Sequence, residues 1–174
     1  MSLSLLTGGA RSGKSSLAVR RAAGTGDPVV FVATGQARDD EMADRIARHR
    51  EERPAGWTTV EAPLELVPAL AGLPARHAVV VDCLSLWVAN LMERGDDEEA
   101  VLTQARRLAA WAVDYRGTVV VVTNEVGLGI VPVHPVSRDY RDRLGRVNAV
   151  VAASADLAQL VVAGRTLTLD PVED

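Results

Sequence analysis

A glycine-rich segment near the start of the chain constrains the fold more than any other feature. Residues 8–15 read Gly-Gly-Ala-Arg-Ser-Gly-Lys-Ser, which fits the pattern G-x-x-x-x-G-K-[ST] at every fixed position. A short apolar run at 3–6 precedes it, and a helical pattern over 15–23 follows it. The alternative is a chance match in a Gly/Ser-rich turn. Because the segment stands between a strand pattern and a helix pattern, as phosphate-binding loops do, we predict a phosphate-binding loop.

The residues of this loop have separate expected tasks toward a di- or triphosphate. The glycines let the backbone turn its N–H groups inward, and the following helix adds the positive end of its dipole. Lys14 is the only lysine among 19 Lys and Arg residues, and we expect it to reach the β- and γ-phosphates. The Ser15 hydroxyl is expected to ligate Mg²⁺. The predicted contacts are Gly8, Gly9, Ala10, Arg11, Ser12, Gly13, Lys14 and Ser15.

Length and composition limit the class of protein. The 174 residues predict a single domain over 1–174, and 48% hydrophobic with 24% charged residues is an ordinary globular composition. A net charge of −4 gives no reason to expect a nucleic-acid binder. The apolar runs, such as 119–122, are too short for a membrane span, and no signal-peptide pattern is visible. The single cysteine, Cys83, suits a reducing cytoplasm, where we expect the protein to reside.

Apolar runs and helical patterns alternate along the chain. We predict strands at 3–6, 29–33, 78–81, 119–122 and 157–162, and helices at 15–23, 39–53, 64–71, 84–92, 98–115 and 138–153. Continuous Val-rich strands between helices favour an α/β fold with a mostly parallel sheet and helices on both faces. Ligands of such folds lie beyond the carboxyl ends of the strands, so functional residues should follow the strands directly.

Polar residues do follow two of these strands. Asp82 ends the apolar run 79–81, as in a Walker B element, and is predicted to hold Mg²⁺ beside Ser15. The alternative is that Asp82 only caps the helix that begins at Leu84. Residues 123–129, Thr-Asn-Glu-Val-Gly-Leu-Gly, bring polar groups and two glycines to the same rim, but a simple turn explains them equally well.

The predicted helix 39–53 carries a histidine among arginines. Acidic residues open the helix and basic residues close it, in agreement with its dipole, and Pro54 stops it. Met42 and Ile46 share one stripe, whereas Arg45, His49 and Arg53 share another, each four residues apart. These cations would disfavour imidazolium and leave a neutral ring nitrogen able to attack phosphorus. The alternative is a solvated basic face with an incidental histidine. The other histidines, His77 and His134, have no partner visible in the sequence.

Five motifs occur in order along nearly the whole chain. They are the phosphate loop, the Arg/His helix with Arg53-Pro54 and Trp57, and the segments 82–90, 123–132 and 138–148. Together they closely resemble the bifunctional adenosylcobinamide kinase / adenosylcobinamide-phosphate guanylyltransferase family of cobalamin synthesis. Departures are small: Ser85 stands where Thr is common in that family, and Tyr140 where Phe is common.

The resemblance implies a fold, two activities and a set of site residues. It implies a RecA-like P-loop NTPase sheet, a homotrimer, GTP and ATP as nucleotide substrates, and adenosylcobinamide and its phosphate as acceptors. It also implies that His49 becomes guanylylated and is catalytic together with Lys14. The remaining nucleotide contacts that it implies are Thr34, Gly35, Gln36, Arg50, Glu51, Glu52, Arg53, Glu61 and Asp82.

Two other classes of function share parts of this pattern. A monofunctional small-molecule P-loop kinase would have everything up to Asp82 and would treat His49 as a surface residue. A GTPase switch reads guanine with N-K-x-D, but here Glu125 follows Asn124 and no lysine lies outside the loop. A RecA-type motor would need a DNA-binding surface, which the acidic balance does not favour.

Overall fold

The computed structural model describes residues 2–51 and 53–172. In this part of the chain seven strands form one sheet in the order β3-β2-β4-β5-β1-β6-β7. Neighbouring strands are parallel except β6 and β7, which form an antiparallel hairpin. The strands are β1 Ser2–Thr7, β2 Val29–Ala33, β3 Thr58–Glu61, β4 Ala78–Asp82, β5 Thr118–Val122, β6 Leu157–Val162 and β7 Arg165–Leu169.

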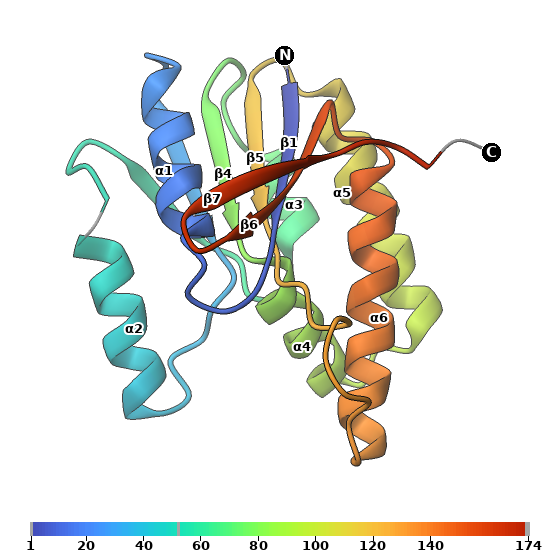
Figure 1. Cartoon of the computed structure of the whole chain (residues 1–174). Coiled ribbons are helices and arrows are strands. Elements are labelled where there is room, and N and C mark those ends of the chain that lie inside the picture. The colour runs from blue at the N-terminus through green and yellow to red at the C-terminus, as the bar shows by residue number, and fades with distance from the viewer. Residues whose placement is uncertain (1, 52, 173–174) are drawn as a thin grey trace.

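Helices cover both faces of this sheet, as predicted. They are α1 Lys14–Gly24, α2 Asp40–Glu51, α3 Leu66–Ala71, α4 Leu84–Arg94, α5 Glu98–Asp114 and α6 Pro135–Ala152. In Figure 1, α1 lies in front of the sheet, whereas α3, α4 and α5 lie behind it. Alternate residues of β4 show both faces to be buried: Val80 packs in the cluster with α1, and Val79 and Val81 pack in the larger cluster with α3 to α6. Among the described residues no helix has the length and apolar character to cross a membrane.

Two edge strands were not predicted. β3 reads Thr-Thr-Val-Glu, in which only the valine is partly buried, and all five residues of β7 are exposed. Neither has the buried apolar run by which the central strands are recognised. Their extended conformation comes from pairing with β2 and β6, so the hydrophobic pattern of their own sequence does not report it.

Several predicted helix boundaries were wrong by two or three residues. The helix predicted over 39–53 ends at Glu51, because the ring of Pro54 disfavours the helical conformation at Arg53. The last predicted helix begins at Pro135 instead of 138, since proline is preorganised for the first helical turn. α4 continues to Arg94, where Gly95 adopts the left-handed conformation that ends helices. α3 begins at Leu66, two residues later than predicted.

The topology brings four strand ends to one edge of the sheet. β1, which leads into the glycine-rich loop, lies beside β5, and β5 lies beside β4. In register, Asp82 of β4 is opposite Ala33 of β2 on one side and Val122 of β5 on the other. The segments that follow these strands therefore share one rim, which is the lower end of the sheet in Figure 1.

Candidate functional site

At two positions of the glycine-rich loop the backbone adopts a conformation that only glycine accommodates. Gly8 has φ +146°, and a Cβ there would lie 2.2 Å from the carbonyl oxygen of Val161 in β6. Gly13 has φ +101° and is the N-cap of α1. The β6–β7 hairpin supports the loop from outside, because Gly164 N donates to Ser12 O at 3.0 Å. The loop is thus shaped by its own glycines and held by a distant part of the chain.

Lys14 begins α1 and is folded back against the loop. Its side chain is buried, and Nζ donates to Gly9 O at 2.6 Å and to Ser12 Oγ at 3.3 Å. An ammonium held on loop oxygens is positioned where the loop backbone would surround an anion.

A pocket of about 730 Å³ lies between α2 and the carboxyl ends of β2, β3 and β4. Seven of the predicted site residues line it: Ser15, Gly35, Gln36, Arg50, Arg53, Glu61 and Asp82. Apolar side chains form much of the remaining wall, namely Phe31, Met42, Ile46 and Leu86. A cavity lined by both apolar and polar side chains suits a nucleoside bound through its base and ribose.

The two predicted metal ligands share this pocket. Ser15 and Asp82 both line it, although they come from α1 and from the end of β4. The helix-cap alternative for Asp82 is wrong, since the N-cap residue of α4 is Cys83. Among the side chains that the structure describes, which do not include those of Glu41, His49 and Glu51, no cluster of three or more His, Cys, Asp or Glu could hold a metal. One hydroxyl and one carboxylate suit Mg²⁺ that takes its other ligands from phosphate and water.

Arg53 forms part of the floor of the pocket. Its guanidinium carbon lies 3.5 Å from the centroid of the Phe31 ring, and Nη1 donates to Thr59 Oγ1 at 3.2 Å. Burial lowers the pKa of Arg53, and the nearby Asp82 carboxylate opposes that shift. Nε is buried and has no hydrogen-bond partner among the described residues. Because Arg53 lies beyond the end of α2, the prediction that it continues a helical stripe with His49 was wrong.

The mouth of the pocket carries an exposed ion pair. Arg50 Nη2 lies 2.7 Å from Glu61 Oε1, and both side chains are more than half exposed. Such pairs contribute little to folding stability, so both groups can exchange this partner for a ligand at small cost.

The segment after β2 is held by two buried side chains, Thr34, which was expected to contact the nucleotide, and Asn90, which the sequence did not single out as a site residue. Thr34 does not line the pocket; its hydroxyl accepts from Cys83 N at 2.8 Å and donates to Cys83 O at 2.7 Å. Asn90 of α4 donates from Nδ2 to Thr34 O and to Pro63 O, at 2.8 and 2.9 Å. Asn90 therefore ties together the segments that follow β2 and β3. In the sequence, only the position of Asn90 in the motif 82–90 indicated that this residue has a structural role.

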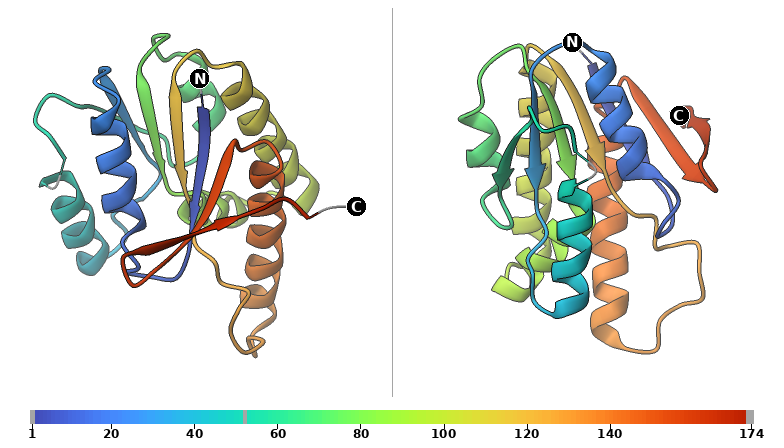
Figure 2. Two further views of the ribbon diagram at one scale, coloured as in Figure 1. Left: turned by 45° about the horizontal axis from the view of Figure 1, so that its top comes forward. Right: turned by 90° about the vertical axis from the view of Figure 1, so that its left-hand side faces the viewer.

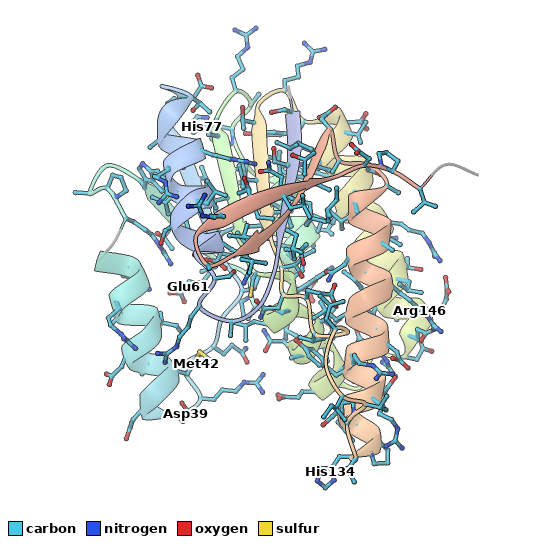
Figure 3. All side chains as sticks on the ribbon, viewed as in Figure 1. Asp39, Met42, Glu61, His77, His134 and Arg146 are labelled. Carbon is cyan, nitrogen blue, oxygen red and sulfur yellow. The ribbon has the colours of Figure 1, made fainter. Side chains whose placement is uncertain are left out.

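The predicted nucleophile lies on α2, the helix that closes the pocket. Met42 and Ile46 of this helix line the pocket, which confirms that they share one stripe, and Figure 3 shows Met42 on the side of α2 that faces the sheet. The side chains of Arg45, His49 and Glu51, and all of Glu52, lie outside the described part of the structure. Figure 3 shows His77 near the opposite end of the sheet and His134 at the lower tip of α6.

The segment after β5 is fixed by a polar network. Thr123 Oγ1 donates to Asn148 Oδ1 at 2.7 Å, and Asn148 Nδ2 donates to Asn124 O at 3.0 Å. Asn124 Nδ2 donates to Ser85 Oγ at 3.0 Å, and the Tyr140 hydroxyl donates to Ser85 O at 3.1 Å. These bonds tie the start of α4 and the segment after β5 to α6, so the segment is more than a simple turn.

Tyr140 should make stability depend on pH in alkaline solution. Burial, reinforced by Cys83 and opposed by a hydrogen bond at Ser85, raises the pKa of Tyr140 to about 12. An unfolded tyrosine loses its proton near pH 10, so between roughly pH 10 and 12 the native state binds more protons and the free energy of unfolding falls as pH rises. The free energy of unfolding, measured with urea at several pH values in this window, should fall less steeply with pH in Tyr140→Phe than in the native protein. The fall that remains is expected from Tyr115, because burial also raises its pKa. An equal slope in both proteins would contradict the role of Tyr140.

Sequence comparisons place this chain among proteins of cobalamin synthesis. The profile of the family described as cobinamide kinase / cobinamide phosphate guanyltransferase matches residues 4–169. The bifunctional adenosylcobalamin biosynthesis protein CobP of Pseudomonas aeruginosa is 42% identical over 166 residues, which is 95% of each chain. CobU of Escherichia coli, with the same description, is 40% identical over 173 residues, 92% of this chain and 95% of that protein.

Structural comparisons show the fold. The flagellar accessory protein FlaH of Methanocaldococcus jannaschii aligns with a TM-score of 0.55 at 14% identity, over 95% of this chain and 74% of that one. The RadB recombinase aligns with a TM-score of 0.54 at 18% identity, over 91% and 73% of the two chains. The prediction of an α/β, RecA-like P-loop NTPase fold is confirmed.

Proposed function

The chain belongs to the cobinamide kinase / cobinamide phosphate guanyltransferase family and is an enzyme with both of those activities, and we propose that it performs them at one nucleotide site with a guanylyl-histidine intermediate at His49. The observation that carries this proposal is the pocket itself. It unites Ser15 and Asp82, next to the phosphate loop, with the inner face of the helix that bears His49.

In the first reaction a hydroxyl of adenosylcobinamide attacks the γ-phosphorus of ATP or GTP. A new O–P bond forms, the bond to the β-phosphate oxygen breaks, and the nucleoside diphosphate leaves while the hydroxyl proton is lost. Lys14 and the inward N–H groups of the loop stabilise the charge that develops on the phosphates. Bound at Ser15 and Asp82, Mg²⁺ would neutralise phosphate charge.

In the second reaction a neutral ring nitrogen of His49 attacks the α-phosphorus of GTP. An N–P bond forms and pyrophosphate leaves, into the loop that is shaped to hold it. A phosphate oxygen of adenosylcobinamide phosphate then attacks the same phosphorus, the N–P bond breaks, and adenosylcobinamide-GDP is formed with free His49. Splitting the transfer in two lets one acceptor site serve both reactions.

Labelled GTP tests the proposal, because the two reactions move different phosphates. With γ-labelled GTP and adenosylcobinamide, the label should appear in adenosylcobinamide phosphate. With α-labelled GTP alone, it should appear on the protein as an acid-labile GMP adduct that peptide mapping assigns to His49. Transfer of the γ-label without any adduct would favour direct guanylyl transfer and contradict the covalent intermediate.

We also propose that the enzyme is a homotrimer in the cytoplasm. The trimer rests on the family resemblance, and the location on the single cysteine of the chain, Cys83, which is buried and has no second cysteine with which to form an internal disulfide. The mass in solution, measured by light scattering, tests the assembly directly.

Arg53 should contribute to guanylylation in a graded manner. Its guanidinium lies in the pocket beside Phe31, so Arg53→Ala would remove one charge-assisted contact to phosphate, worth roughly 1.5–3 kcal/mol. We expect adduct formation to slow by about tenfold to a hundredfold without being abolished. Arg53→Lys should recover only part of the rate, since an ammonium lacks the planar fork. Arg48→Ala, at an exposed position of α2, is the matched control and should keep the native rate. A native rate in Arg53→Ala would exclude Arg53 from the phosphate site.

A further inference from the structure

The connection between β5 and α6 exposes an unusual series of apolar side chains. Leu128 is 82% exposed, Ile130 97% and Val133 87%. Others are also exposed within the same eleven residues, namely Val126, Val131 and Val136. In the right panel of Figure 2 this connection swings away from the sheet as an open loop. Several large, solvent-exposed apolar side chains on one segment indicate a binding surface.

The loop is held at both ends by specific hydrogen bonds. At its start Asn148 Nδ2 donates to Asn124 O at 3.0 Å, and Gly127 N donates to Glu125 Oε1 at 2.6 Å. At its end Arg138 Nη1 donates to the carbonyl oxygens of Pro132 and Val133, at 3.0 and 2.5 Å. Two side chains of α6, Asn148 and Arg138, thus fix the backbone that presents the apolar residues.

The loop starts beside the phosphate loop, at the end of β5, which lies between β4 and β1, and its residues lie outside the nucleotide pocket. Glu125 N donates to Gly8 O at 3.1 Å, so the first residues of the two loops are hydrogen-bonded. None of the residues 123–136 lines the pocket, which lies between α2 and the ends of β2, β3 and β4. A phosphoryl acceptor has to reach the γ-phosphate without displacing the nucleoside. The apolar loop lies beside the phosphate loop, where such an acceptor would approach the γ-phosphate.

We propose that this loop, residues 126–136, is the surface on which the corrin macrocycle of the acceptor rests. Methyl groups and methylenes line the edge of a corrin ring, so the ring buries apolar area against side chains such as Leu128 and Ile130. Its amide side chains can bond to backbone groups of the loop. Continuity with the phosphate loop favours the acceptor over a second copy of the chain. The proposal rests on cobinamide being the acceptor in the proposed function.

Substitutions at the most exposed positions test this surface with little risk to folding. Leu128→Ser and Ile130→Ser should each raise the KM for cobinamide about tenfold or more, because each removes a side chain that the ring would bury. The kcat at saturating cobinamide and the GMP adduct formed with GTP alone should stay at native levels. Val113→Ser, an exposed apolar position on α5, is the matched control and should change none of these values.

The other outcomes separate this inference from the proposed mechanism. A native KM for cobinamide in both loop variants overturns the inference, and a lower mass by light scattering at native KM assigns the loop to contacts between copies. An equal rise of the KM for cobinamide in Val113→Ser also overturns the inference. If the native protein turns over cobinamide without forming an adduct, the histidine intermediate fails but the loop assignment stands. If the native protein turns over no cobinamide, both fail.

Discussion

Lys14→Ala should lose both activities. γ-Transfer and pyrophosphate release each build negative charge on the β- and γ-phosphates, and Lys14 is the only lysine of the chain. Removing one preorganised positive group from such a site costs several kcal/mol, so we expect kcat for each reaction to fall by roughly a hundredfold to a thousandfold. Separate assays with γ- and α-labelled GTP measure the two losses.

Arginine should not replace this lysine. The Lys14 ammonium fits between Gly9 O and Ser12 Oγ in a buried position, whereas a guanidinium is planar and larger, so Lys14→Arg should also be inactive. Arg20→Ala, which removes an exposed cation from the same helix, is the matched control and should remain active. Thermal unfolding shows whether the variants are folded. A folded Lys14→Ala protein with near-native kinase activity would refute the assignment of the phosphate loop.

The second large effect separates the two reactions at His49. If its imidazole is the nucleophile for GMP and takes no part in γ-transfer, His49→Ala should form no adduct and no adenosylcobinamide-GDP. It should still phosphorylate adenosylcobinamide at a substantial rate. His49→Asn keeps polarity but has no nucleophilic ring nitrogen, so it should behave in the same way. Intact-protein mass after incubation with GTP, followed by peptide mapping, measures the adduct.

The other two histidines of the chain provide the control. His77 donates its backbone N–H toward the Tyr115 hydroxyl near one end of the sheet, and His134 is the N-cap of α6. Figure 3 shows both far from the labelled Met42 and Glu61, which line the pocket. His77→Ala and His134→Ala should keep the native adduct. An undiminished adduct in His49→Ala, or one mapped to either other histidine, would overturn the mechanism.

Much of the candidate site could be predicted because parallel strands end at one edge. The apolar run of β4 predicted that Asp82 would lie at the same rim as the phosphate loop, and the structure brings Asp82 and Ser15 into one pocket. The residues that hold this rim together could not be predicted. Asn90 and Asn148 act through backbone carbonyls far away in sequence, and no spacing pattern reports such bonds.

The sequence by itself determined the phosphate loop and the layered fold, because both depend on local rules. Gly8 and Gly13 adopt backbone angles that side chains disfavour, and Val-rich runs between helices suit a sheet buried on both faces. Only the tertiary structure decided the edge strands β3 and β7, which exist through pairing with their neighbours. It also decided where the side chain of Arg53 lies, since its guanidinium packs on Phe31 of β2. These features depend on contacts between distant segments, and only the folded chain brings those segments together.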